Sequence, residues 1–205
     1  MKSKIIIRII IVALMSVTVA ACSKTPKEAP QTTEAPSTAA APADTTGSAT
    51  ALPQFDVDNA FRTQLSAVFN AYLAVKDALV ASDAAQVKSK TPDLNHALQQ
   101  VDMKLLSGAA HNDWMTYQPA METAIKSIES STDLEAQRQQ FHTLSQNLYK
   151  TIKAYGLSGS TAYYDYCPMA FNNAGASWLS NTTQIRNPYF GNAMLTCGSV
   201  KETLK

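Results

Sequence analysis

Apolar residues recur at three- and four-residue steps between positions 58 and 155, and this spacing predicts amphipathic helices. The first helix is predicted over residues 58–81, with an apolar stripe of Leu65, Val68, Phe69, Tyr72, Val75 and Leu79. After it, Ser82 and Asp83 supply capping chemistry, but Thr91-Pro92 interrupts the helical pattern. Because proline is tolerated in a first helical turn, the main second helix is predicted to begin at Thr91 and to end at Ser107-Gly108.

Two further helices are predicted before position 156. The third lies around residues 111–129, with a kink at Pro119, and the fourth opens on Thr132-Asp133-Leu134-Glu135, which has capping-box spacing. Four helices with short connections predict an antiparallel four-helix bundle, so the predicted fold class is all-α. The methionines of this region are interpreted as helix-packing residues; they are Met103, Met115 and Met121.

The composition changes after Gly156. Aromatic and turn-forming residues crowd together between positions 160 and 205 without a helical period. We expect an irregular, aromatic-rich C-terminal cap on the bundle, with short strands at 162–166 and 177–179. The aromatic residues Trp178, Tyr189 and Phe190 are candidates for a partner-binding groove, and the alternative is that they pack the cap against the bundle.

The first 22 residues have the pattern of an export signal. A short basic region is followed by an apolar run that is too short to be interpreted first as a membrane-spanning helix. The run ends in Val19-Ala20-Ala21-Cys22, which resembles a bacterial lipobox. We therefore expect a lipoprotein signal peptide at 1–21 and lipidation of Cys22; the alternative is an ordinary secretory signal with an accidental cysteine. Ser23 after the cysteine favours an outer-membrane anchor, with the domain facing the periplasm or the cell surface.

Residues 22–54 consist almost entirely of Pro, Ala, Thr, Ser and charged residues. Such a segment cannot bury enough apolar surface to offset the entropy lost on ordering, so we expect a lipidated, disordered tether. One helical domain at 55–205 would follow it. Without residues 1–21, the 17 basic and 16 acidic residues of the chain lose three basic members, which leaves a net charge of −2. This charge argues against nucleic acid as a partner.

Sequence motifs for enzymatic chemistry are absent. There is no P-loop, no dinucleotide-binding glycine turn, no HExxH and no nucleophile elbow. The three histidines, His96, His111 and His142, lie on different predicted segments, and no two of them have the four-residue spacing of helical metal ligands. We therefore expect a protein that is not an enzyme.

Two C-terminal stretches each place a cysteine close to a methionine. Cys167 and Met169 lie in the first, and Met194 and Cys197 in the second. Thiolate and thioether donors select Cu(I), so the four residues are a candidate soft-metal site. With Cys22 lipidated, the domain keeps two cysteines in an oxidising compartment, which is typical of a Cys167–Cys197 disulfide. Two free buried thiols are the third alternative.

The stretches YCPMAFNNAGASWLS and IRNPYFGNAMLTCG resemble the C-terminal signature of an uncharacterised bacterial periplasmic domain family, a domain of unknown function. Members of that family occur as secreted or lipid-anchored proteins and as extensions of periplasmic adaptor subunits of heavy-metal (copper/silver-type) efflux pumps. The resemblance implies a helical fold and a metal-efflux component as partner. The related efflux-adaptor motif has a histidine after the methionine, where this chain has Ala170.

Together these observations favour an outer-membrane-tethered binding or accessory module in Cu(I)-type metal handling or efflux. The alternative is a structural or protein-interaction lipoprotein domain with a Cys167–Cys197 disulfide and no metal role.

Overall fold

The computed structural model describes residues 49–205. The predicted signal peptide, the lipidation of Cys22 and most of the predicted tether lie outside the described residues. The described helices are α1 (Asn59–Val80), α2 (Ala84–Gln99), the short 3-10 helix η1 (Met103–Leu105), α3 (Gly108–Ser130), α4 (Leu134–Tyr155), α5 (Ala170–Asn173) and a second 3-10 helix, η2 (Gly191–Ala193). The strands are β1 (Ala49–Ala51), β2 (Ala162–Cys167), β3 (Ala176–Ser180) and β4 (Ser199–Leu204). No helix in this part of the chain is long and apolar enough to cross a membrane.

Three of the long helices begin where aspartate side chains satisfy free backbone N–H groups. Asp58, Asp83 and Asp133 accept hydrogen bonds from the backbone N–H groups at the starts of α1, α2 and α4. The predicted start of the second helix at Thr91 is wrong, because α2 begins at Ala84 and continues through Pro92. The Thr91 side chain is buried and donates to the carbonyl oxygen of Val87, so Thr91 is part of the helix core.

The predicted all-α fold class is wrong, since the C-terminal segment forms a sheet. The four strands lie in the order β1-β4-β2-β3, and the sheet is mixed. Strand β2 is antiparallel to both β3 and β4, whereas β1 is parallel to β4. The expected strands at 162–166 and 177–179 correspond to β2 and β3, but β4 and β1 were not anticipated. Strand β1 lies within the segment expected to be a tether.

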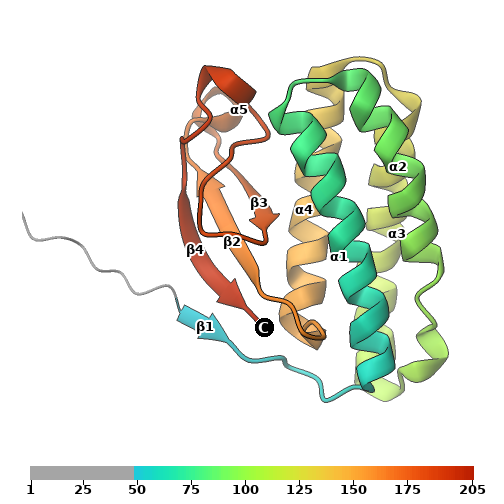
Figure 1. The fold of residues 1–205 in the computed structure, drawn as a ribbon. Coiled ribbons are helices and arrows are strands. Elements are labelled where there is room, and N and C mark those ends of the chain that lie inside the picture. Colours follow the sequence, from blue (N-terminus) through green and yellow to red (C-terminus); the bar gives the residue numbers. More distant parts are fainter. Residues whose placement is uncertain (1–48) are drawn as a thin grey trace, which may run out of the picture. The chain divides into compact units, whose positions relative to one another are not determined.

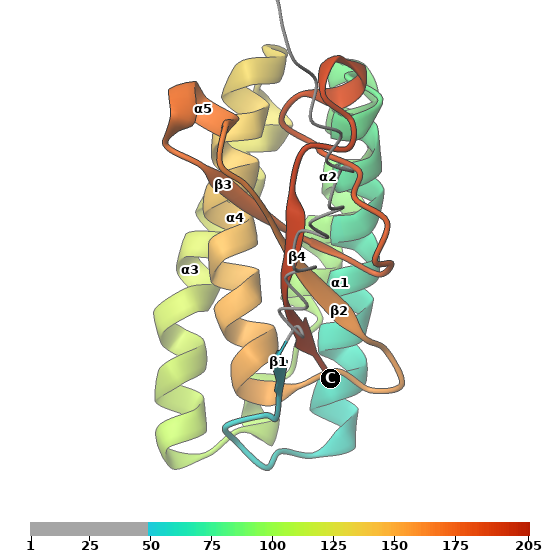
Figure 2. The same cartoon turned by 90° about the vertical axis from the view of Figure 1, so that its left-hand side faces the viewer.

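The sheet covers one side of the helical bundle. Figure 1 shows the strands beside α1 and α4, with α2 and α3 on the far side of the bundle, and Figure 2 shows the strands passing in front of α1 and α4. Tyr72 of α1 joins the two layers. Its ring stacks on Phe141 of α4, and its hydroxyl bonds with Ser145 and accepts from the backbone N–H of Leu179 in β3. These contacts fix the sheet against the helices.

Candidate functional site

The sheet brings the two domain cysteines together. Cys167 is the last residue of β2, and Cys197 lies just before β4, which pairs with β2 through Tyr166 and Ser199. Both thiols are free; Cys167 is buried and Cys197 is partly exposed. A hydrogen bond to Cys167, together with burial, raises the pKa of the Cys197 thiol to about 11. The thiols of Cys167 and Cys197, thirty positions apart in the sequence, are therefore neighbours in the structure.

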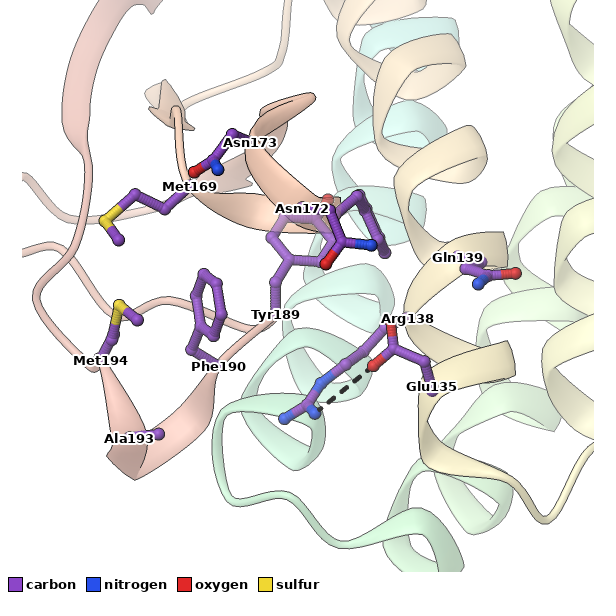
Figure 3. Close-up of a pocket in the computed structure, with 11 residues that line it drawn as sticks. Glu135, Arg138, Gln139, Met169, Asn172, Asn173, Tyr189, Phe190, Ala193 and Met194 are labelled. Carbon is purple, nitrogen blue, oxygen red and sulfur yellow. Dashed lines mark ion pairs between the residues drawn. The ribbon is translucent and has the colours of Figure 1, made fainter. Parts of the chain in front are cut away.

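Both methionines of the candidate site lie beside this thiol pair. The backbone N–H of Cys197 donates to the carbonyl oxygen of Met194 at 3.1 Å, and the Cys197 sulfur accepts from the backbone of Met169. Met169 and Met194 are 46% and 36% exposed, and they line the same cavity of about 800 Å³. Figure 3 shows their sulfur atoms on the same side of this cavity. The structure therefore joins Met169 and Met194 to Cys197 through backbone contacts, and of the four sulfur residues only the two methionines line this cavity.

Asn187 holds the loop that carries Met194 and Cys197. Its side chain is fully buried, and its amide donates to the carbonyl oxygen of Cys197 at 2.8 Å. Its side-chain oxygen accepts from the backbone N–H of Tyr189, also at 2.8 Å. From α4, the guanidinium of Arg138 donates to the carbonyl oxygen of Pro188 at 3.0 Å. The buried amide thus holds the two ends of the loop together, and the arginine joins the loop to the bundle.

The turn after Met169 has an unusual backbone. Phe171, Asn172 and Asn173 have φ angles of 51°, 56° and 69°, all in the left-handed region. This region is disfavoured for residues with a side chain by about 1–2 kcal/mol each, and asparagine tolerates it better than phenylalanine. The Phe171 ring contacts those of Tyr189 and His142, at centroid separations of 5.3 and 5.6 Å, and these contacts stabilise the turn. Such strain concentrates at functional sites, and here it lies beside the candidate sulfur ligands.

The cavity has two chemically different walls. Met169, Met194 and Phe190 line one side, and Glu135, Arg138 and Gln139 of α4 line the other (Figure 3). Arg138 and Glu135 form an ion pair at 4.0 Å, so the polar wall has little net charge. The thioethers of Met169 and Met194 are therefore open to a space large enough for part of a partner molecule.

The three aromatic candidates for partner binding differ in exposure. Trp178 is 0% and Tyr189 5% exposed, and the Tyr189 hydroxyl donates to the carbonyl oxygen of Ser177 at 2.6 Å. Burial of these two rings favours the packing alternative for them. Phe190 is only partly buried and lines the cavity. Tyr189 also lines this cavity, but Phe190 is the most exposed of the three and therefore remains the aromatic candidate for partner contact.

Asp165 is an unusual residue in this structure, and no motif in the sequence selects it. It is fully buried in β2, and within the described part of the chain neither carboxylate oxygen has a hydrogen-bond partner of good geometry. Burial raises the pKa of Asp165 to about 7, while the ammonium of the buried Lys76 on α1 and the indole N–H of Trp178 act in the opposite direction. The sequence AYYDYC does not reveal that Asp165 faces inward unless the register of the strand is known. A register shift between Tyr164 and Asp165 makes that register harder to predict.

The histidines do not form a metal site with carboxylates or cysteines. In residues 49–205, no group of three or more His, Cys, Asp or Glu side chains is arranged to hold a metal ion. A site with three or more protein ligands in this region would therefore need at least one donor of another type, such as a thioether sulfur or a backbone oxygen.

Comparison with known proteins gives one match. The model of a family described as a protein of unknown function (DUF3347) matches residues 68–160, which is less than half of the chain. The match covers most of the helical bundle and ends before β2 and both cysteines, so the chain is similar over its bundle to a domain of unknown function. No curated protein and no solved structure matches the chain.

Proposed function

We propose that this chain is a lipid-anchored accessory module that binds Cu(I) through Cys167, Met169, Met194 and Cys197. The observation that carries the proposal is the contact between the two free thiols, with both methionines bonded through their backbones to Cys197. Two thiols and two thioethers are soft donors, and two to four of them suit the low coordination numbers of Cu(I). The proposed periplasmic efflux context rests on the resemblance of the two cysteine stretches.

Binding to both cysteines would release protons. Two neutral thiols and one Cu(I) ion give a bis-thiolate complex of charge −1 and two free protons. The raised pKa of Cys197 makes this deprotonation harder, so the apparent affinity rises with pH through the neutral range. The exposed methionines would receive the ion at the rim of the cavity, and the buried thiol would hold it.

The test is a Cu(I) titration of the reduced full chain against a competing chelator without oxygen. We expect Cys167→Ser with Cys197→Ser to weaken binding at least roughly a hundredfold, and Met169→Leu with Met194→Leu to weaken it about tenfold. Met121→Leu, in the buried bundle core, is the matched control and should change nothing. Equal affinity of the wild type and the double serine variant would refute the proposal.

The same thiol contact favours a second candidate, a structural domain closed by a Cys167–Cys197 disulfide. In that reaction two thiols lose two protons and two electrons to an oxidant of the compartment. The closed loop would stabilise the fold by roughly 3–4 kcal/mol in the chain-entropy model. Intact mass of the freshly isolated protein distinguishes the two candidates, because the bridge makes the chain two hydrogens lighter.

Membrane anchoring through Cys22 belongs to the proposal and rests on the lipobox-like sequence. Outer-membrane fractionation tests it, since Cys22→Ser should release the protein from the membrane.

A further inference from the structure

Two methionines far from the cysteines are unexpectedly exposed. Met103 in η1 is 45% exposed and Met115 in α3 is 44% exposed, whereas Met121 is fully buried as expected for a helix-packing residue. Both exposed side chains lie near the connection between α2 and α3. Figure 1 shows this connection at the opposite end of the bundle from α5, which follows Met169. Any role of these two exposed side chains is therefore separate from the thiol site.

A histidine completes a set of three neighbouring soft donors. His111 and Met115 are four residues apart on α3, so they lie on one helix face with Cβ atoms roughly 5–6 Å apart. Met103 lines a cavity of about 580 Å³ together with His111. It also lines a cavity of about 200 Å³ together with Met115. Met103 thus shares a cavity with each of the two residues of α3.

The backbone around these donors is firmly held. On either side of η1, Val101 and Leu106 are buried, which leaves Met103 on the outside of the turn. The side chain of Gln64 on α1 accepts from the backbone N–H of Asp102 at 2.9 Å. On α3, the buried Trp114 forms part of the wall of the smaller cavity and packs edge-on against Phe61 at 5.4 Å. The three donors therefore belong to backbone segments, η1 and α3, that are held in place by buried contacts.

We propose that Met103, His111 and Met115 form a second binding site for a soft monovalent cation, Cu(I) or its chemical mimic Ag(I). Two thioethers and one imidazole are neutral donors of the kind that these ions accept. Binding there releases no thiol proton and leaves the charge of the ion uncompensated. Asp102 and Lys104 both line the larger cavity, so their opposite charges add little net attraction. The second site is therefore weaker than the thiol site and independent of it.

The test uses Ag(I) nitrate alone, in chloride-free buffer, on the full chain carrying Cys167→Ser and Cys197→Ser. Methionine methyl groups labelled with ¹³C report each thioether separately by NMR. We expect the Met103 and Met115 signals to shift together and to saturate at one equivalent, while the Met121 signal stays fixed. Met169 and Met194 are an internal comparison, a thioether pair without cysteine partners in this variant, and should respond only at higher Ag(I).

Removal of the imidazole makes the test specific. His111→Gln should weaken Ag(I) binding at Met103 and Met115 about tenfold, whereas His96→Gln on α2, which is outside both cavities, should leave it unchanged. Separate midpoints for the Met103 and Met115 signals, or no effect of His111→Gln, would overturn the proposal. Because the first titration needs no change at these three residues, a folding defect in the His111 variant cannot decide the outcome.

Discussion

The helical bundle and the sheet layer fix their side chains by different means. In the bundle, leucine, isoleucine and phenylalanine side chains of α1, α2, α3 and α4 pack in a core that continues into the sheet layer. Three of these helices begin at ordinary aspartate caps. We expect such a core to tolerate volume-conserving exchanges between apolar residues.

In the sheet layer, individual positions require a particular residue type. The amide of Asn187 bonds to both ends of one loop, and three consecutive residues adopt left-handed backbone angles. Gly198, next to Cys197, lies so close to other groups that no side chain fits there. This layer also contains the two thiols, the exposed candidate ligands Met169 and Met194, and the buried Asp165. The difference teaches that the candidate thiol site lies in a layer where several positions depend on one particular residue.

The largest effect should follow from Gly198→Ala. A Cβ atom at this position would lie 2.8 Å from the Trp178 ring and 3.0 Å from the carbonyl oxygen of Tyr166. The φ angle of 140° is also unfavourable for alanine. Since the Trp178 ring is fully buried, it cannot move aside cheaply. We expect a loss of about 3–4 kcal/mol in the free energy of unfolding, measured by urea denaturation.

Gly108→Ala is the matched control in the bundle. Gly108 also has a positive φ angle, 56°, but no heavy atom lies within 4 Å of the place that a Cβ atom would occupy, so only the backbone cost of about 1 kcal/mol remains. Equal losses of unfolding free energy in Gly198→Ala and Gly108→Ala would contradict the prediction, because they would show that close packing against Trp178 does not distinguish the sheet layer from the bundle.

A smaller effect, dependent on pH, should follow from Asp165→Asn. Between about pH 4 and pH 7 the native state keeps a proton on Asp165 that the unfolded state has released, because burial raises its pKa from 3.8 to about 7. The contribution of Asp165 to stability is therefore greatest at acidic pH and declines as the pH rises through this window. Asparagine never carries the charge, so the variant should exceed the wild type by about 2 kcal/mol at pH 8.

The difference in unfolding free energy between the wild type and Asp165→Asn separates the titration of Asp165 from that of other groups. Burial lowers the pKa of His142, which alone would make the domain less stable at acidic pH, but this contribution is common to both proteins. The measured quantity is the difference in unfolding free energy from pH 4 to pH 8. A difference that does not grow with pH would mean that Asp165 is charged in the native state throughout.

The bundle could be predicted from sequence because its signal is local. Helical spacing at Leu65, Val68 and Phe69 needs only neighbouring residues to be recognised, and the same holds for the start of α4 at Asp133. The start of α2 was predicted wrongly, because proline was expected only in a first helical turn. Burial of Thr91 and its hydrogen bond to the carbonyl oxygen of Val87 instead favour a helix that continues through Pro92.

The sheet could not be predicted completely because its pairing is distant. Strand β4 reads SVKETL, with little apolar alternation, and it forms by pairing with β2 and with β1, which lies about 150 residues earlier in the chain. The four sulfur residues could be identified as candidates from their spacing in the sequence. The proximity of Cys167 to Cys197, however, depends on the pairing of β2 with β4. The exposure of Met103 and Met115 was missed for the same reason, since the path of the chain between α2 and α3 decides it.

The smallest effect should follow from Leu94→Met on α2. Leu94 is fully buried, and α2 lies on the far side of the bundle from the sheet (Figure 1). Methionine conserves volume and adapts to its neighbours, so we expect a loss of less than about 1.5 kcal/mol. NMR signals of the loop from Asn187 to Cys197 should not change. If this exchange instead shifted those signals or cost as much as Gly198→Ala, the two layers would share one tightly coupled core, and the tolerance attributed to the bundle would be lost.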